Sequence, residues 1–119
     1  MKIANPLGRE GEEIAAKYLQ NLGFKIIDRN FRGRNTELDI VAVHKNTLVF
    51  IEVKTRTTDK FGTPFEQIAY WKLKSLIKAA QFYKLTHKNL PELMRIDAIS
   101  VQYYSNGPQV EHLQNISGF

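Results

Sequence analysis

The chain has 119 residues, of which 43% are hydrophobic, with no cysteine and a formal net charge of +5. This length predicts a single domain over residues 1–119 with one hydrophobic core. The lack of cysteine excludes disulfides and thiolate zinc sites, and no apolar run reaches the length of a membrane span. No signal-peptide pattern opens the sequence, so a soluble cytoplasmic protein with no membrane partner is expected. The positive charge permits a polyanionic partner without identifying one.

Hydrophobic periodicity predicts the order of helices and strands. In chain order we expect a helix at about 6–22, strands at 24–31, 36–43 and 48–55, a long helix at 65–85, and strands at 94–104 and 109–113. Pro6 and Gly23 suit the start and the end of the first helix, and Pro91 follows the second. This αβββαβ order predicts an α/β protein in which helices pack on a mixed sheet.

Three charged side chains interrupt the two apolar strands of the central hairpin: Asp39, Glu52 and Lys54. If residues 44–47 form the turn, with Asn46 available for a positive φ, the numbers of opposed residues sum to 91. Asp39 would then face Glu52 with Cβ atoms roughly 5 Å apart, and Lys54 would share the face of Glu52. Opposed carboxylates in an apolar sheet repel each other, and a divalent cation between them would remove that repulsion. The spacing therefore predicts a metal site.

The residue types suit a hard cation such as Mg²⁺, which takes one or two protein carboxylates and leaves positions for water and phosphate. Lys54 would stabilise negative charge or orient an attacking water. The alternative is a solvated strand face on which Glu52 pairs with Lys54, and Asp39 pairs with an arginine. Against it, apolar residues share the faces of the charges: Leu48 and Phe50 with Glu52, and Val41 and Val43 with Asp39.

These residues resemble a known signature. Asp39 followed by Glu52-Val53-Lys54 is similar to the D…(D/E)-x-K pattern of the restriction-endonuclease-like PD-(D/E)XK nucleases. Leu38 and Thr36 depart from the Pro and Gly that such sequences often carry, and neither is a proposed ligand. A closer resemblance is to the YraN family of uncharacterised bacterial proteins, relatives of archaeal Holliday-junction resolvases, through residues 8–12, 15–19, 23–24, 29–31, 37–40, 48–56 and 61–62.

The resemblance implies a restriction-endonuclease-like αβββαβ core and a Mg²⁺- or Mn²⁺-dependent cleavage that leaves a 5′-phosphate. It implies that Asp39 and Glu52 hold the ion, with the carbonyl of Val53 as a further ligand. Lys54 would assist the attacking water. Glu12 matches a helical glutamate that supports the metal, although an acid in the first helical turns also simply complements the helix dipole.

Three further residues have two interpretations each. Glu37 is either another acid near the metal or the cross-strand ion-pair partner of Lys54. Lys72 lies beside the apolar stripe of the long helix, where it would reach a carboxylate or phosphate, or extend along the edge of the core. Gln67, one turn earlier, would bind a phosphate or a water, or face solvent.

Basic residues near the hairpin are candidates for binding nucleic acid. Arg32 and Arg34 precede the Asp39 strand, Arg56 follows Lys54, and Lys60 lies in the next loop. Arginine matches phosphate geometry, and such contacts make binding depend on salt. No base-reading motif is present, so recognition of nucleic-acid structure is favoured over recognition of sequence. The three histidines, His44, His87 and His112, show no ligand spacing and are expected at the surface.

The predicted function is a divalent-metal-dependent endonuclease acting on structured nucleic acid, with DNA favoured over RNA. The alternative is a non-catalytic nucleic-acid-binding module on a nuclease fold, acting within a DNA-processing assembly. A purely structural module leaves the grouped Asp, Glu and Lys unexplained. A junction-cutting role would favour a homodimer, although no segment identifies an interface.

Overall fold

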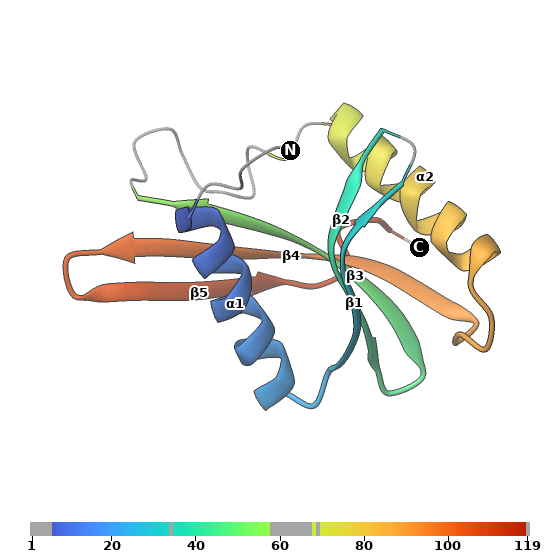
Figure 1. Cartoon of the computed structure of the whole chain (residues 1–119), viewed down its shortest axis with the longest axis horizontal. Coiled ribbons are helices and arrows are strands. Elements are labelled where there is room, and N and C mark those ends of the chain that lie inside the picture. Colours follow the sequence, from blue (N-terminus) through green and yellow to red (C-terminus); the bar gives the residue numbers. More distant parts are fainter. Residues whose placement is uncertain (1–5, 34, 58–67, 69, 119) are drawn as a thin grey trace.

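The computed structural model describes residues 6–33, 35–57, 68 and 70–118 (Figure 1). Its elements are α1 Pro6–Asn21, β1 Lys25–Arg32, β2 Glu37–His44, β3 Thr47–Arg56, α2 Tyr70–Thr86, β4 Leu93–Tyr104 and β5 Gly107–Leu113. The predicted αβββαβ order is confirmed. The long helix begins at Tyr70, and the first residues of the predicted helix, 65–67, lie outside the described part of the chain. No helix in the described ranges has the length and apolar character to cross a membrane.

The five strands form one mixed sheet in the order β1-β2-β3-β4-β5. The pairs β1–β2, β2–β3 and β4–β5 are antiparallel, whereas β3 and β4 are parallel. Parallel neighbours need a crossover connection, and α2 lies in the segment that joins β3 to β4. The predicted α/β class with a mixed sheet flanked by helices is therefore correct.

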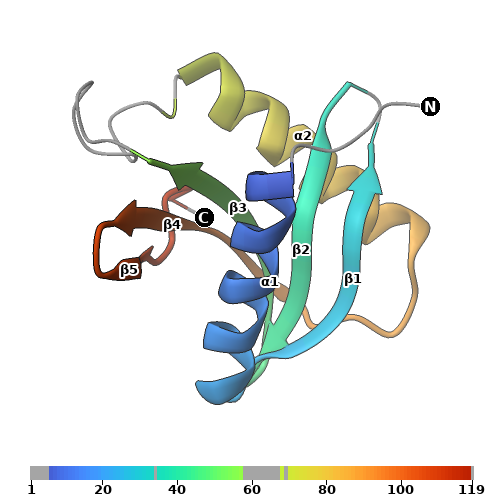
Figure 2. The same cartoon turned by 60° about the vertical axis from the view of Figure 1, so that its left-hand side comes forward.

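The two helices pack on opposite faces of the sheet (Figure 2). From Ile40 to Val43, consecutive residues of β2 alternate between the two cores, because strand side chains point to opposite faces. The core on the α1 side contains Ala15, Ala16, Leu19, Phe24, Ile40, Ala42, Val49, Ile51, Ile99 and Val101. The core on the α2 side contains Leu38, Val41, Leu48, Phe50, Leu76, Ala79, Ala80, Tyr83 and Ile96.

The register predicted for the central hairpin is confirmed over five pairs, from His44–Thr47 to Ile40–Ile51. The turn differs in one detail, because Lys45, and not Asn46, has the positive φ of 54°. Within the described residues the pairing stops at Ile40–Ile51. Asp39 and Glu52 would form the next pair, so the strands separate where the predicted site begins.

Strand alternation breaks at two residues that lie across from each other on β1 and β2. Arg29 contacts Glu13 of α1, whereas Phe31, two residues later, packs with the rings of α2. Asn30 between them has a φ of 52°, a left-handed conformation that asparagine tolerates better than most residues. On β2, Leu38 and Ile40 likewise belong to opposite cores, with Asp39 between them. The break allows Asp39 to lie on the α1 side of the sheet.

Gly11 lets α1 approach the end of β3. A Cβ at this position would lie 2.0 Å from Oγ1 of Thr55, a separation that no side chain can adopt. Only glycine therefore permits the helix and the strand to pack this closely. The close packing brings the next residue, Glu12, to the separated ends of β2 and β3.

Candidate metal centre

Three carboxylates gather at this end of the sheet. Glu12 of α1 and Glu37 and Asp39 of β2 each offer an oxygen, and the three oxygens lie within 4.8 Å of one another. The carboxamide of Asn30 joins two of these acids, because its Nδ2 donates to Glu12 Oε1 at 3.0 Å and to Glu37 Oε1 at 3.1 Å. We call Glu12, Glu37 and Asp39 the acidic cluster.

Asp39 fills the gap where β2 and β3 separate. Its Oδ2 accepts a hydrogen bond of 2.8 Å from the backbone N–H of Val53. If the hairpin register continued, this N–H would donate to the main-chain carbonyl of Leu38. The Asp39 side chain therefore replaces one backbone hydrogen bond between β2 and β3. Burial, and then the charge and hydrogen bond of the neighbouring Glu52, raise the pKa of Asp39 to about 9 against the opposing effect of the Val53 N–H.

Glu52 approaches Asp39 from the other side of the sheet and is held by two lysines. Its side chain is only 5% exposed, and its Oε2 lies 3.7 Å from Nζ of Lys54 and 3.6 Å from Nζ of Lys72. Lys72 belongs to α2, and of its two interpretations the structure shows the one in which it reaches a carboxylate. The alternative of a solvated strand face is wrong, because Glu52 is buried, although the ion pair between Glu52 and Lys54 is present.

The acidic cluster and the Glu52–lysine group therefore come from opposite sides of the sheet and meet in the gap. The expectation that Asp39 shares a face with Val41 and Val43 is wrong, because those valines pack with the core on the α2 side. The alternation break at Asn30 and Asp39 is the physical reason. The two carboxylates of Asp39 and Glu52 still interact, as the raised pKa of Asp39 reflects.

Glu37 does not make the ion pair with Lys54 that cross-strand register predicted. Its Oε2 lies 3.9 Å from Nη2 of Arg32, whose side chain is 70% exposed, and its Oε1 accepts the hydrogen bond from Asn30. Arg32 is consequently the basic residue found beside the acidic cluster. Arg56 is half-buried near the end of β3.

Sequence reasoning missed a second buried acid, Asp97 of β4. Its side chain is 0% exposed and accepts hydrogen bonds from Nε and Nη2 of Arg95 at 3.0 and 3.3 Å and from the N–H of Asn115 at 2.8 Å. Nε2 of His112 lies 2.8 Å from Asp97 Oδ2. Burial alone would raise the pKa of Asp97, but these hydrogen bonds outweigh it and hold the pKa below its ordinary value.

The histidines are not the free surface residues that were expected. The side chain of His112 is 5% exposed and pairs with Asp97, because β5 places it over β4. His44 stacks on Phe24 with ring centroids 4.0 Å apart, and His87 stacks on Tyr83 at 3.8 Å. None of the three joins the acidic cluster.

Comparison with known proteins identifies the family. The model of "Uncharacterised protein family UPF0102" matches residues 11–101. The chain belongs to the UPF0102 family. This confirms the resemblance to YraN proteins.

Relatives described as UPF0102 proteins match almost the whole chain. One from Geobacter metallireducens is 40% identical over 92% of this chain and 89% of its own length. One from Syntrophotalea carbinolica is 47% identical over 89% of this chain and 86% of its own length. One from Geobacter sulfurreducens is 44% identical over 92% of this chain and 86% of its own length. Among solved structures, Pyrococcus furiosus SfsA in complex with Ca²⁺ aligns with a TM-score of 0.42 and 16% identity, covering 91% of this chain and 62% of that chain.

The UPF0102 match spans every residue of the candidate centre, from Glu12 to Lys72. The described part of the chain brings together these predicted site residues: Glu12, Asp39, Glu52, Lys54 and Lys72. Glu37, which had two interpretations, lies with them, and so does Asn30, which was not predicted. Three predicted residues, Arg34, Lys60 and Gln67, lie outside the described part. The carbonyl of Val53 stays a prediction as a ligand. The acidic cluster could hold a metal ion, because it offers only oxygen atoms in a compact group.

Proposed function

We propose that this UPF0102 chain is a divalent-metal-dependent phosphodiesterase that acts on nucleic acid, with DNA favoured over RNA. The observation that carries the proposal is the acidic cluster: three carboxylate oxygens within 4.8 Å of one another beside the buried Glu52. So many acids in a partly buried position repel one another, and a cation would offset that repulsion. Burial first, and then the neighbouring Glu52, raise the pKa of Asp39, so the ionised form of this carboxyl is poorly compensated without a cation.

Oxygen-only ligands favour Mg²⁺ or Mn²⁺ over softer metals. Asp39 belongs both to the acidic cluster and to the Asp39–Glu52 pair predicted from the sequence, so we assign it as the central ligand. Glu12 and Glu37 would complete the group on the α1 side. A bound cation supplies positive charge to a phosphate oxygen and lowers the pKa of a bound water.

The lysines would bind the substrate phosphate. Lys54 and Lys72 both lie within 4 Å of the Glu52 carboxylate, so two ammonium groups are held beside the acidic cluster. Positive charge fixed in a partly buried site stabilises the negative charge that develops on a phosphodiester during hydrolysis. Glu52 would keep both lysines in place. Arg32, exposed at the edge of the cluster, would contact the next phosphate along the strand.

A specific observation favours a second candidate, a nucleic-acid-binding module without catalysis. Glu52 is already neutralised by two lysines, so it has less charge to offer a cation. In that case the lysines would bind phosphate and no metal would be needed. The two functions differ in their dependence on Asp39.

The test is calorimetric titration of Mg²⁺ and Mn²⁺ into the wild type, Asp39→Asn and Glu52→Gln, with cleavage of a branched DNA followed in parallel. Glu111→Gln, at an exposed position of β5, is the matched control. We expect the wild type and the control to bind metal and nick DNA, and Asp39→Asn to lose both. DNA binding that needs no metal and produces no nicks would instead support the binding module. Metal-dependent nicking by Asp39→Asn would disprove the assigned centre.

A further inference from the structure

One face of α2 carries side chains that are exposed or half-buried. Trp71, Ser75, Lys78, Phe82 and Leu85 follow one another at spacings of three or four residues, which places them on one side of the helix. Trp71 is 70% exposed and Leu85 is 85% exposed. We call these five residues the α2 outer face. Exposed apolar groups of this size, together with the half-buried Phe82 between them, are typical of a binding surface.

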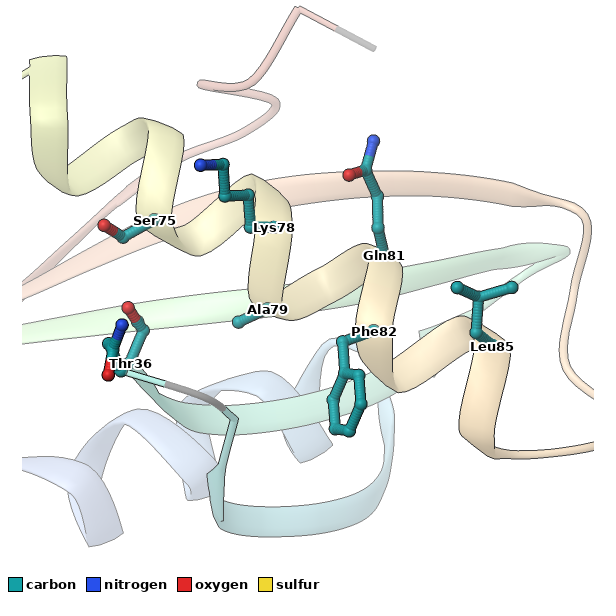
Figure 3. Close-up of a pocket in the computed structure, with 8 residues that line it drawn as sticks. Thr36, Ser75, Lys78, Ala79, Gln81, Phe82 and Leu85 are labelled. Carbon is teal, nitrogen blue, oxygen red and sulfur yellow. The ribbon is translucent and has the colours of Figure 1, made fainter.

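Part of this face forms a wall of a pocket of about 460 Å³ (Figure 3). Asn35 and Thr36, at the turn between β1 and β2, form the opposite wall. The turn comes close to the helix at Gly33, where a Cβ would lie 3.2 Å from the Cβ of Ala79. The pocket combines an aromatic ring, Phe82, with the polar groups of Ser75 and Lys78.

The charge of α2 indicates what kind of partner fits. The helix contains four lysines, Lys72, Lys74, Lys78 and Lys84, and no acidic residue. Nζ of Lys74 lies 5.3 Å from the centre of the Tyr70 ring, so an exposed aromatic and a cation occur together. Aromatic platforms interleaved with lysine are the combination by which proteins bind single-stranded nucleic acid: bases stack on the rings and phosphates lie against the cations.

We propose that the α2 outer face binds an unpaired strand of nucleic acid, with one base stacked on Trp71 and another in the pocket against Phe82. This inference rests on the proposed function and gives its substrate class. Trp71 and Phe82 lie eleven positions apart, which corresponds to a helix rise of about 16 Å. This length accommodates several stacked nucleotides at about 3.4 Å each. Lys78 lies between the rings, where it meets the phosphates.

Other occupants fit the face less well. The centre of a protein–protein interface is usually poor in lysine, whereas this face and its flanks carry several. A second copy of the chain would bring the same lysines against themselves, which is unfavourable. A nucleic-acid strand satisfies both the exposed rings and the charge.

The face also adjoins the candidate metal centre at two points. Trp71 is followed by Lys72, whose Nζ contacts Glu52, and the pocket residue Thr36 is followed by Glu37 of the acidic cluster. A strand bound along the α2 outer face would therefore pass its backbone close to the centre. The proposed substrates are accordingly branched or flapped structures that contain an unpaired segment next to a duplex.

The single tryptophan of the chain provides a direct test, because base stacking quenches indole fluorescence. The full-length protein would be titrated in EDTA with a thymidine oligonucleotide, with an abasic oligonucleotide of equal length, and with a blunt duplex. We expect quenching by the thymidine strand and not by the abasic strand. By fluorescence anisotropy with labelled DNA, Trp71→Ala should bind the single strand about 5-fold or more weakly, with little change for the duplex.

Tyr104→Ala is the matched control, because Tyr104 is an exposed aromatic on the β4–β5 hairpin, which points away from α2 (Figure 1). Tyr104→Ala should bind single strands as the wild type does, whereas Lys78→Gln should bind them more weakly. Equal quenching by abasic DNA, or unchanged affinity in Trp71→Ala, would overturn the inference while metal-dependent nicking still upholds the proposed function. A wild type that binds no single strand in EDTA overturns the inference, and one that also neither binds nor nicks nucleic acid in the presence of metal overturns both. A smaller sedimentation coefficient for Trp71→Ala would show a contact between copies and overturn the inference.

Discussion

Two aspartates of one sheet, the half-buried Asp39 and the buried Asp97, have opposite surroundings. Asp39 has one hydrogen-bond donor from the backbone, the N–H of Val53, and its neighbours include the carboxylates of Glu12 and Glu52. Asp97 accepts from Arg95 and Asn115 and pairs with His112. The pKa of Asp39 rises to about 9, first by burial, whereas hydrogen bonds overcome burial and lower the pKa of Asp97.

The difference sets a structural charge apart from a carboxyl that we propose to be functional. The negative charge of Asp97 is compensated within the chain, so its contacts stabilise the α1 side of the sheet. The ionised form of Asp39 is not compensated within its cluster, and carboxyl groups with strongly perturbed pKa values are frequent at functional sites. Variants of the two aspartates should therefore respond in opposite ways.

The largest effect is expected for Asp97→Asn. The amide keeps the shape of the side chain but leaves Arg95, which is only 19% exposed, without its counter-ion. Removing one partner of a buried pair costs about 3–5 kcal/mol, and the partial exposure of Arg95 favours the lower value. Urea unfolding at pH 7 in EDTA would measure the loss. Glu111→Gln should unfold as the wild type does, and an equally stable Asp97→Asn would show that the pair is not structural.

Metal binding should stabilise the wild type through Asp39 and leave Asp97 uninvolved. A ligand that binds only the folded state at 100 times its Kd adds about 2.7 kcal/mol. We therefore expect Mn²⁺ or Mg²⁺ to raise the Tm of the wild type. Thermal unfolding in EDTA and in excess metal would measure the rise. Asp39→Asn should show no rise. The same rise in both proteins would place the ion elsewhere.

Asp39→Asn should behave oppositely to Asp97→Asn when no metal is present. Because the pKa of Asp39 is raised to about 9 in the folded protein, folding at neutral pH protonates this carboxyl, at a cost in free energy that the neutral amide avoids. The carbonyl oxygen of the asparagine still accepts the Val53 N–H. We expect urea unfolding in EDTA to show a variant at least as stable as the wild type. Marked destabilisation would mean that Asp39, like Asp97, is a structural charge.

The sequence predicted those features that depend on regular strands. Alternation and turn residues gave the register of β2 and β3 correctly from His44–Thr47 to Ile40–Ile51, although they placed Asp39 and Glu52 on one face. The helical spacing of Lys72 gave contact with a carboxylate as one of two interpretations, and the structure shows this contact with Glu52. These features follow from periods of 2.0 and 3.6 residues, which a single sequence carries.

Irregular features were not predictable in the same way. The alternation break needs a left-handed Asn30 across from Asp39, and nothing local separates that Asn from one in an ordinary strand. The role of Gly11 depends on how closely α1 packs on Thr55, which is a tertiary property. Asp97 carried a usable signal, because it shares parity with the apolar Ile99 and Val101 and follows Arg95 by two residues. The criterion that identified Asp39, a charged side chain within an apolar strand, also identifies Asp97.

The pH dependence of stability should also have opposite directions at the two sites. For Asp39 the folded pKa is raised to about 9 from 3.8, so its contribution to stability is fully present below pH 3.8 and is lost as the pH rises toward 9. For Asp97, which faces Arg95 and His112, the folded pKa is lowered, so its contribution is present above pH 3.8 and is lost as the pH falls through the folded value.

Urea unfolding in EDTA from pH 3 to 9 would measure both. The wild type minus Asp39→Asn difference in unfolding free energy should fall with rising pH, by less than about 1.4 kcal/mol per pH unit, the limit for one proton. The wild type minus Asp97→Asn difference should be level above pH 4 and shrink below it. Two differences that change in the same direction would contradict the contrast, because they would mean that both carboxylates are compensated, or neither.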